Sequence, residues 1–526
     1  MKTKPKPKTK KKLPVRRVDH FTEKIKSLDE LEALIKKFKA AGKKVVLCHG
    51  TFDLLHPGHI HHFYAARKKG DVLIVTITQD EYVGKGPGRP VFNQRLRTES
   101  VAAIECVDFA AVNQWPTAIE TIKKLKPSFY VKGSDYRNAE DDVTGNIRLE
   151  ENAVREVGGE LTFTDEVTFS SSSLLNTYFN VFSEETQLFL KTFRDRYTAD
   201  DVINKLKDVG KLKVLVVGDS IVDEYHYCPA LGKSPKETIV TTRYLSEESF
   251  AGGVLACANH VAGFCDQVDL VTCLGTQNTR EDFIRTHLKP NVRPTFFYRD
   301  DASTVVKRRF VDPTFLSKMF QVSFLTDKML PENVDHELQE HLTKIMPNYD
   351  LVLVADYGHG LISPSTIRVL ERLCPYLGIN TQTNSANLGY NLITKYRRAD
   401  YVCIDEPEVR LAMHDRSSPL EGLILRIHKL LKCKVVTITR GHLGSVTYTA
   451  GEGFAKTPVL SDEIVDRVGA GDAFFAVTAP LAAAGFPPDL ISFIGNMVGA
   501  MAVKIVCNRS FIEPASLFRF TKAILR

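Results

Sequence analysis

The chain has 526 residues, of which 43% are hydrophobic and 25% charged; this is ordinary globular composition, but too much chain for one hydrophobic core. Its ten cysteines form no Cys-x-x-Cys pair, which excludes a disulfide framework and favours reduced thiols in a cytoplasmic protein. No apolar run has the length of a membrane-spanning helix, so we expect no membrane partner.

The first twenty residues are predicted to be a disordered basic tail. Nine Lys and Arg and no acid lie between Met1 and Arg17, interleaved with Pro, and such a segment cannot bury a core. Without these nine charges the formal net charge of +7 becomes slightly negative. We therefore do not expect nucleic acid as a partner, and the role of the tail stays open.

From residue 21 the pattern alternates between helix and strand. Ser27 and Glu30 fit a capping box in front of an amphipathic helix, which Gly42 ends. This alternation predicts a Rossmann-like α/β domain with a parallel sheet over residues 21–182. Its strand-like runs cover residues 45–48, 72–78, 129–131 and 161–164.

A polar, helix-prone stretch over residues 183–210 carries no motif, and we interpret it as a helical linker. A second α/β series over residues 211–526 predicts a second domain, which closes with a helix-rich end. Its strand-like runs cover residues 214–217, 351–355, 401–404 and 435–439.

The first chemical motif joins a strand to a helix. The strand at 45–48 runs through Gly50, Thr51 and Phe52 to His56-Pro-Gly-His59, with the proline suited to the first turn of a helix. His56 and His59 are three residues apart and face the same way on that turn. A helix N-terminus favours phosphate, so the pattern predicts a site where imidazoles donate hydrogen bonds to phosphoryl oxygens.

These residues resemble the signature of the cytidylyltransferase-like nucleotidyltransferases, and the resemblance covers about 130 residues. It implies that His56 and His59 hold the nucleotide phosphates and that a serine-rich loop caps a helix at the β and γ phosphates. Lys85, in a Gly-Pro-rich loop, is either a phosphate ligand or an exposed lysine. The phosphate-binding residues that the resemblance implies are Lys85, Arg97, Lys132, Ser170, Ser171 and Ser172.

The implied reaction is in-line attack of a sugar or polyol phosphate on the α-phosphorus of ATP or CTP, with release of pyrophosphate. The protein contributes positioning and charge neutralisation. Thr51 is similar to the residue of glycerol-phosphate cytidylyltransferases at this place, where heptose adenylyltransferases often have Cys. One residue does not decide between ATP and CTP.

The second motif is Gly469-Ala470-Gly471-Asp472 in front of an apolar helix. The two glycines bring backbone N–H groups to a helix N-terminus, which is an anion site. Asp472 can accept a proton from a hydroxyl while those N–H groups stabilise the transferring phosphoryl group.

Further glycine and acidic motifs precede it in the sequence: Gly218-Asp219, Gly252-Gly253, Asp356 to Gly360, Asp405 with Glu408, and Thr439 to Gly441. Taken in this order along the chain, the motifs resemble those of the ribokinase-like (PfkB) sugar kinases over roughly 300 residues. The resemblance implies that Asp472 is the catalytic base and that Asp219, Gly252 and Gly253 contact the sugar. Asp405 and Glu408 would lie near Mg²⁺, with a plain helix-start pair as the alternative. The nucleotide would contact Thr439, Gly441, Gly469, Ala470 and Gly471.

The two domains together resemble the bifunctional heptose kinase/adenylyltransferases, in reversed order. The resemblance implies synthesis of a nucleotide-activated sugar from a sugar phosphate, with ATP and Mg²⁺ as cofactors. The oligomeric state stays open, with a homodimer as one alternative. Ala256, Asn380 and Gln382 depart from the kinase pattern. The alternative is therefore an active nucleotidyltransferase with a weakened kinase domain that serves as a sugar sensor or scaffold.

Overall fold

The computed structural model describes residues 21–86, 89–134, 146–164, 182–326, 328–461 and 463–525. The chain divides into two compact units, with the main boundary between residues 177 and 178. Among the described residues, no helix combines the length and apolarity that crossing a bilayer requires. All ten cysteines are free thiols.

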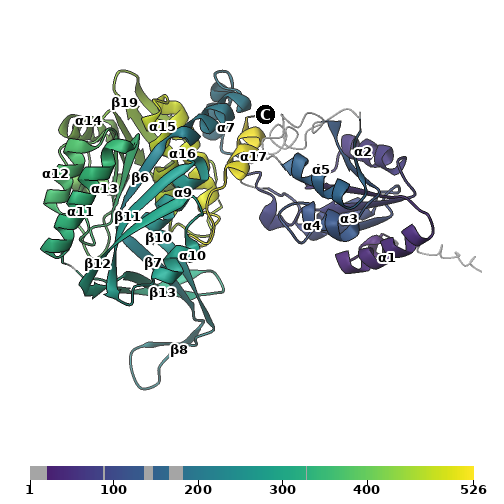
Figure 1. Ribbon diagram of the computed structural model, residues 1–526, viewed down its shortest axis with the longest axis horizontal. Coiled ribbons are helices and arrows are strands. Elements are labelled where there is room, and N and C mark those ends of the chain that lie inside the picture. The colour runs from purple at the N-terminus through teal and green to yellow at the C-terminus, as the bar shows by residue number, and fades with distance from the viewer. Residues whose placement is uncertain are drawn as a thin grey trace, which may run out of the picture. The chain divides into compact units, whose positions relative to one another are not determined.

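The N-terminal unit is built on a parallel five-stranded sheet in the order β3-β2-β1-β4-β5 (Figure 1). The expected capping box at the start of α1 is present, because Ser27 and Glu30 each accept the other's backbone N–H. The elements are α1 (Leu28–Ala40), β1 (Val45–Gly50), α2 (Pro57–Arg67), β2 (Val72–Ile77), α3 (Gln94–Ala102), β3 (Phe109–Val112), α4 (Ile119–Leu125), β4 (Phe129–Lys132), α5 (Asn146–Glu156) and β5 (Glu160–Phe163).

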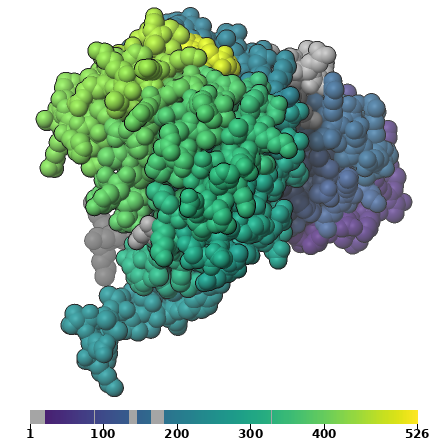
Figure 2. Space-filling model, turned by 60° about the vertical axis from the view of Figure 1, so that its left-hand side comes forward, coloured from purple at the N-terminus to yellow at the C-terminus, as the bar shows by residue number. Residues whose placement is uncertain are grey.

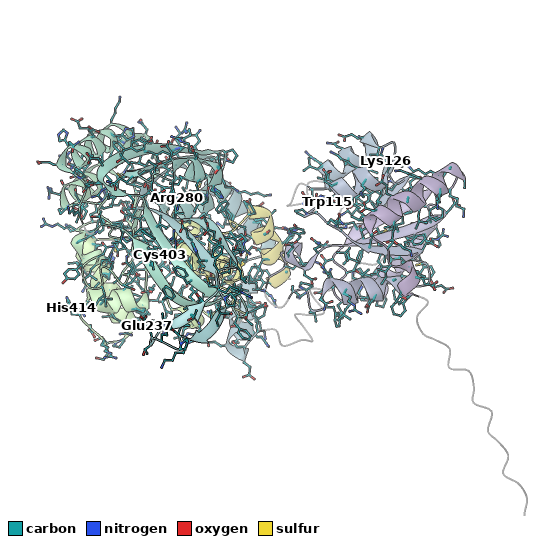
Figure 3. All side chains as sticks on the ribbon, turned by 90° about the horizontal axis from the view of Figure 1, so that it is seen from below. Trp115, Lys126, Glu237, Arg280, Cys403 and His414 are labelled. Atoms are coloured by element: carbon teal, nitrogen blue, oxygen red, sulfur yellow. The ribbon has the colours of Figure 1, made fainter. Side chains whose placement is uncertain are left out.

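Two hydrophobic clusters cover the two faces of this sheet. Val45 and Leu47 of β1 pack with α1, α4 and α5, whereas Val46 and Cys48 pack with α2 and α3. This alternation follows from the two-residue period of a strand that is buried on both faces. Trp115, the only tryptophan of the chain, packs against the first of these clusters (Figure 3).

The C-terminal unit contains a nine-stranded sheet in the order β12-β11-β6-β15-β16-β17-β18-β19-β20, with antiparallel pairing only at β18-β19-β20. Helices cover both faces, α11 to α14 on one and α9, α15 and α16 on the other (Figure 1). The strands are β6 (Lys213–Gly218), β11 (Gln267–Gln277), β12 (Val292–Ser303), β15 (Leu351–Asp356), β16 (Leu377–Thr381), β17 (Tyr401–Asp405), β18 (Val435–Thr439), β19 (Ser445–Thr449) and β20 (Gly453–Thr457). The helices are α9 (Val254–Phe264), α10 (Glu281–His287), α11 (Glu332–Ile345), α12 (Pro364–Leu373), α13 (Glu406–Ala412), α14 (Leu420–Leu431), α15 (Ala470–Ala483), α16 (Pro488–Ala502) and α17 (Pro514–Ile524).

A second, four-stranded sheet in this unit has the order β10-β7-β13-β14. The two-stranded hairpin β8-β9 stands out from the surface of the same unit (Figure 2). These strands are β7 (Ser220–Tyr227), β8 (Ala230–Lys233), β9 (Val240–Thr242), β10 (Ser246–Gly253), β13 (Val305–Asp312) and β14 (Ser317–Phe324).

The segment that we interpret as a linker is an integral part of the C-terminal unit, which corrects that interpretation. It forms α7 (Glu184–Arg194) and α8 (Ala199–Asp208). The Phe193 ring stacks on Phe493 with centroids 4.1 Å apart, and Arg194 donates to the carbonyl oxygen of Ile524 over 2.7 Å. Apolar residues of both helices are buried there, so hydrophobic burial holds this segment on the kinase-like fold.

Candidate functional site

The first site lies where β1 passes into α2. His56 is the N-cap residue of α2 and is 7% exposed, and its ring stacks on that of His59 with centroids 3.9 Å apart. The Phe52 ring meets His59 edge-on at 5.3 Å. Burial lowers the pKa of the His56 imidazole, which keeps the ring neutral near neutral pH. The structure thus places the two histidines together at a helix N-terminus, as the sequence predicts.

Gly50 has a steric role in this turn. A Cβ atom at Gly50 would lie 3.0 Å from the Phe52 ring, and Phe52 itself adopts a left-handed φ of 47°. Non-glycine residues rarely adopt this conformation, so its presence beside the histidines is typical of a functional turn. Thr51 lies between them, half-buried.

The topology of the sheet also favours this position. The chain leaves β1 toward β2 and β3 on one side and returns to β4 and β5 on the other, so the order reverses between β1 and β4. Ligands of open α/β sheets bind outside the carboxyl ends of the strands at such a reversal. The motif at the end of β1 and Lys132 at the end of β4 both lie there.

Lys132 supplies positive charge at this edge. Its ammonium pairs with Glu150 Oε2 at 3.0 Å, and Glu150 also accepts the Tyr130 hydroxyl. Burial, together with the nearby Lys132 charge, lowers the pKa of His49 to about 3 and that of His62 to about 4. Protonation of His49 and His62 is therefore disfavoured at this edge of the sheet, whereas the same positive charge of Lys132 would favour a bound anion.

The Arg97 side chain is fully buried and is engaged with the protein itself. Its guanidinium donates to the carbonyl oxygens of Thr51, Phe92 and Thr78 over 2.5, 2.8 and 2.8 Å, and it pairs with Asp80 at 2.5 Å. These bonds hold the loop that carries the first motif. Four of the five N–H groups of Arg97 are therefore engaged with the protein, and its contact with a phosphate stays a prediction.

The remaining nucleotide residues of this domain divide into two groups. Lys85 is half-buried in the loop between β2 and α3. Ser170, Ser171 and Ser172 lie outside the described residues.

The second site lies at the start of α15. Gly469 is the N-cap residue with a left-handed φ of 86°, and a Cβ atom there would lie 2.2 Å from Asn508 Oδ1. Only glycine therefore fits this turn. Ala470 and Gly471 begin the helix, so their N–H groups are among those without an intrahelical acceptor.

Asp472 is half-buried in the first turn of α15, and its Oδ1 accepts the Tyr357 hydroxyl over 2.8 Å. Burial raises the pKa of Asp472 to about 6, while the Tyr357 hydrogen bond and the Lys307 charge act in the opposite direction. A carboxyl group with a pKa close to the working pH is suited to proton transfer. The structure thus places this carboxyl group in the same helix turn as the two glycines.

Two buried residues that sequence reasoning missed surround this carboxylate. Lys307 on β13 is 7% exposed; burial lowers its pKa, and the charges of Asp223, Asp472 and Asp219 oppose that shift. Asp223 on β7 is 4% exposed and forms an ion pair with Arg309. The only sequence feature that could have indicated Lys307 and Asp223 is the presence of a charged residue within an otherwise strand-like run.

Gly252 explains how Asp223 is accommodated. A Cβ atom at Gly252 would lie 2.0 Å from Asp223 Oδ2, so the glycine makes room for the carboxylate. Gly253, with a φ of 58°, begins the turn into α9. Gly252 therefore stands beside the buried Asp223 carboxylate, whereas Gly253 lies against the backbone carbonyl oxygen of Asp219.

Asp219 directly follows β6, and its carboxylate binds the backbone of the turn after β15. Its Oδ2 accepts the backbone N–H groups of Tyr357 and His359 over 3.0 and 3.3 Å, and its Oδ1 accepts that of Leu361 over 3.3 Å. Burial and the Asp356 charge raise its pKa to about 6. Asp219 therefore holds the turn that carries Tyr357, and its contact with a sugar stays a prediction.

Asp405 and Glu408 form a capping box at the start of α13, in agreement with the alternative reading of this pair. Glu408 also accepts the Thr383 N–H over 2.9 Å. Burial and the Asp405 charge raise the pKa of Glu408 to about 8, and burial raises that of Asp405. Among the described residues, no group of three His, Cys, Asp or Glu side chains could hold a metal ion.

The remaining residues of the nucleotide side end neighbouring strands. Thr439 ends β18, and Gly441, with a φ of 57°, follows it. Asn380 donates to the carbonyl oxygen of Cys403 over 2.7 Å, and the Gln382 N–H donates to that of Asp356. Ala256 is fully buried in α9. Asn380 thus joins two strands, and nothing in the structure gives Ala256 a role beyond packing.

Comparisons with known proteins find both families that the two motifs resemble. Residues 47–177 match the cytidylyltransferase-like family, and residues 211–506 match the pfkB family of carbohydrate kinases. The chain is 46% identical over 114 residues to bifunctional protein HldE of Sulfurimonas denitrificans, covering 21% of this chain and 24% of that protein. For HldE of Geobacter metallireducens the identity is 35% over 167 residues, which covers 31% of this chain and 32% of that protein. The chain thus matches about a quarter to a third of the length of these relatives.

Solved structures similar to the chain include Escherichia coli phosphofructokinase-2 in complex with potassium, with 13% identity and a TM-score of 0.49 over 60% of this chain and 100% of that one. Arabidopsis thaliana ribokinase with ribose and ATP has 17% identity and a TM-score of 0.45 over 59% and 99%. With the family match covering more than half of its residues, the chain belongs to the pfkB family of carbohydrate kinases and carries a cytidylyltransferase-like domain ahead of the kinase domain.

Proposed function

We propose that the chain makes a nucleotide-activated sugar in the cytoplasm by two reactions. The C-terminal domain phosphorylates a sugar or sugar phosphate with ATP. The N-terminal domain transfers a nucleoside monophosphate from ATP or CTP to a sugar or polyol phosphate and releases pyrophosphate. The family memberships support this pairing, as do partial matches to relatives that are named bifunctional.

The arrangement of Asp472 carries the kinase half of the proposal. The hydroxyl of the acceptor sugar gives its proton to Asp472, its oxygen attacks the terminal phosphorus of ATP, and ADP leaves as the bond to its β-phosphate oxygen breaks. The N–H groups of the turn at Gly469 receive the negative charge of the transferring phosphoryl group. Lys307 and Asp223 approach the same place from β13 and β7, so they are suited to bind the acceptor. Because these groups are all present, we favour an active kinase over a sugar-binding scaffold.

The stacked pair of His56 and His59 carries the transferase half. A phosphate oxygen of the acceptor attacks the α-phosphorus of the nucleotide, and pyrophosphate leaves in line. The two imidazoles donate hydrogen bonds to the phosphoryl oxygens as charge develops, and the α2 N-terminus favours the same charge. Lys132 and Lys85 add positive charge.

Mg²⁺ fits this scheme as a companion of the nucleotide. The ion supplies neutralisation of phosphate charge, and in such enzymes it is held largely by phosphates, water and one or two carboxylates. Asp405 and Glu408 lie at the carboxyl end of β17, where carboxylates can serve in that way. Their oxygens already accept backbone N–H groups, so contact through water suits them better than direct ligation.

Phosphorus NMR of the protein with Mg²⁺, ATP, CTP and a panel of sugar phosphates tests the proposal. Heptose 7-phosphate and heptose 1-phosphate belong in this panel because the chain resembles the bifunctional heptose kinase/adenylyltransferases. ADP with a new sugar-phosphate signal demonstrates the kinase, and pyrophosphate from one nucleotide identifies the donor of the transferase. Pyrophosphate without ADP for every acceptor would contradict the kinase half.

A further inference from the structure

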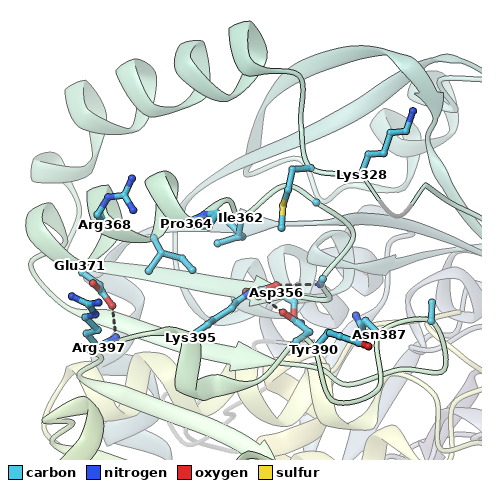
Figure 4. A pocket seen from close by; sticks show the side chains of 16 residues that line it. Lys328, Asp356, Ile362, Pro364, Arg368, Glu371, Asn387, Tyr390, Lys395 and Arg397 are labelled. Atoms are coloured by element: carbon cyan, nitrogen blue, oxygen red, sulfur yellow. Dashed lines mark hydrogen bonds and ion pairs between the residues drawn. The ribbon is translucent and has the colours of Figure 1, made fainter.

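A pocket of about 570 Å³ opens beside the carboxyl end of β15, on the side of α12 (Figure 4). This volume is in the range that holds a small organic ligand. Its walls come from the turn after β15, from α12 and from the segment 386–397. None of Asp472, Lys307 or the turn at Gly469 lines it, so the residues proposed for phosphoryl transfer do not form this hollow.

Positive charge dominates the lining. It contains Lys328, Arg368, Lys395 and Arg397, but only two acids. One acid, Asp356, is paired with Lys395 at 2.5 Å. The guanidinium groups of Arg368 and Arg397, by contrast, have no acidic partner among the described residues.

The second acid of the lining, Glu371, is engaged as well. Its Oε1 accepts the backbone N–H groups of Arg397 and Arg398. The carboxylate therefore anchors the chain at the pocket wall, and two guanidinium groups are left to meet an anion. Guanidinium groups bind phosphate through paired hydrogen bonds and remain charged at all physiological pH values.

The rim of the pocket carries an exposed aromatic ring. Tyr390 is 89% exposed, and its loop is tied to the end of β15 by two asparagines. Asn387 donates to the carbonyl oxygen of Tyr357 over 2.8 Å, and Asn391 donates to that of Asp356 over 2.9 Å. A tyrosine held in place at the mouth of a cationic pocket provides a flat apolar face for the ring of a ligand.

We propose that this pocket binds a phosphate ester, with the phosphate at Arg368 and Arg397 and the ring of the ligand against Tyr390. The shared chemistry is a phosphomonoester attached to a ring, which both a nucleoside monophosphate and a sugar phosphate offer. The proposal does not depend on the identity of the kinase substrate.

Isothermal titration of the full chain tests this site, with AMP, glucose 6-phosphate and inorganic phosphate as probes. Mg²⁺ and ADP are present throughout to fill the kinase nucleotide site. The double variant Arg368→Gln/Arg397→Gln is compared with Arg372→Gln, an exposed arginine of the same helix that does not line the pocket. We expect at least about tenfold weaker binding of one ester in the double variant and unchanged binding in the control.

The probes distinguish the two sources of the ester. A loss for AMP alone identifies a nucleotide, a loss for glucose 6-phosphate alone identifies a sugar phosphate, and a loss for both identifies the shared phosphate. Tyr390→Ala should weaken the affected ester but not inorganic phosphate. Equal binding of all three probes by the wild type and a folded double variant would overturn the proposal, whatever the kinase assay shows.

Discussion

The Tyr357 hydroxyl donates a hydrogen bond to Asp472 Oδ1 over 2.8 Å and so joins the turn after β15 to the first turn of α15. Asp219 holds the same turn, because it accepts the backbone N–H of Tyr357. The three residues form a chain of contacts from the end of β6 to the expected proton acceptor. The pKa of Asp472 is therefore set jointly by burial, by Tyr357 and by Lys307.

Tyr357→Phe should move the pH dependence of the kinase reaction. The hydrogen bond stabilises the ionised form of Asp472, so its loss raises the pKa of this carboxyl group from its value of about 6. The midpoint of log kcat/KM against pH should rise by roughly one unit, the equivalent of one charged hydrogen bond. Tyr376→Phe removes a hydroxyl elsewhere in the unit and should leave the midpoint unchanged; an equal shift in both variants would contradict this assignment.

Lys307→Met should lower ADP formation by about a hundredfold, which is the order of magnitude for removing one preorganised donor that stabilises developing negative charge. The Lys307 charge lowers the pKa of Asp472, so the pH midpoint should rise as well. Lys344→Met, at an exposed position on α11, serves as the control for loss of one charge. Wild-type turnover in Lys307→Met would show that this buried lysine is only structural.

Asp472→Asn should stabilise the protein at neutral pH even though it abolishes kinase activity. Burial raises the pKa of Asp472 from 3.8 to about 6 in the folded state, so folding favours the protonated carboxyl. The wild type therefore loses stability relative to the variant as the pH rises from about 4 to about 6, and the difference stays constant above that. Thermal unfolding at pH 4 and pH 7.5 measures this effect. A variant with the lower Tm at pH 7.5 would contradict the pKa assignment.

Arg97→Met should destabilise the N-terminal unit by about 3 kcal/mol or more, because three carbonyl groups and Asp80 lose their buried partner. Fluorescence of Trp115 reports urea unfolding of this unit, since it is the only tryptophan in the chain. Arg95→Met, on the same helix but with an 84% exposed side chain, should change the unfolding free energy little. Similar midpoints for both variants would instead favour a ligand-binding role for Arg97.

Much of the architecture could be predicted because it follows from local patterns. The strand at 435–439 and the capping box at Ser27 are set by residues close together in sequence. The small sheet that carries Asp223 and Lys307 was not predicted. Its strands bury charged residues, which the sequence pattern of a strand does not predict. These charges come close to one another only when β7 and β13 pair across some 80 residues of intervening chain.

The site residues show the same limit. His56 and His59 were predicted to lie together because a spacing of three residues at the start of a helix places both side chains on the same face. Arg97 and Asp219 are different, since a buried residue that binds backbone and one that binds ligand have the same appearance in a single sequence. Only the position of the backbone N–H and C=O groups around them reveals their roles.

The most direct test of the account measures ADP and pyrophosphate formation in parallel for the wild type, Asp472→Asn and His59→Ala, with the acceptors identified by phosphorus NMR. The account predicts that Asp472→Asn abolishes ADP formation and retains pyrophosphate release, whereas His59→Ala shows the reverse. Loss of both products in either folded variant, or retention of the product that should disappear, would contradict two separate active sites in this chain.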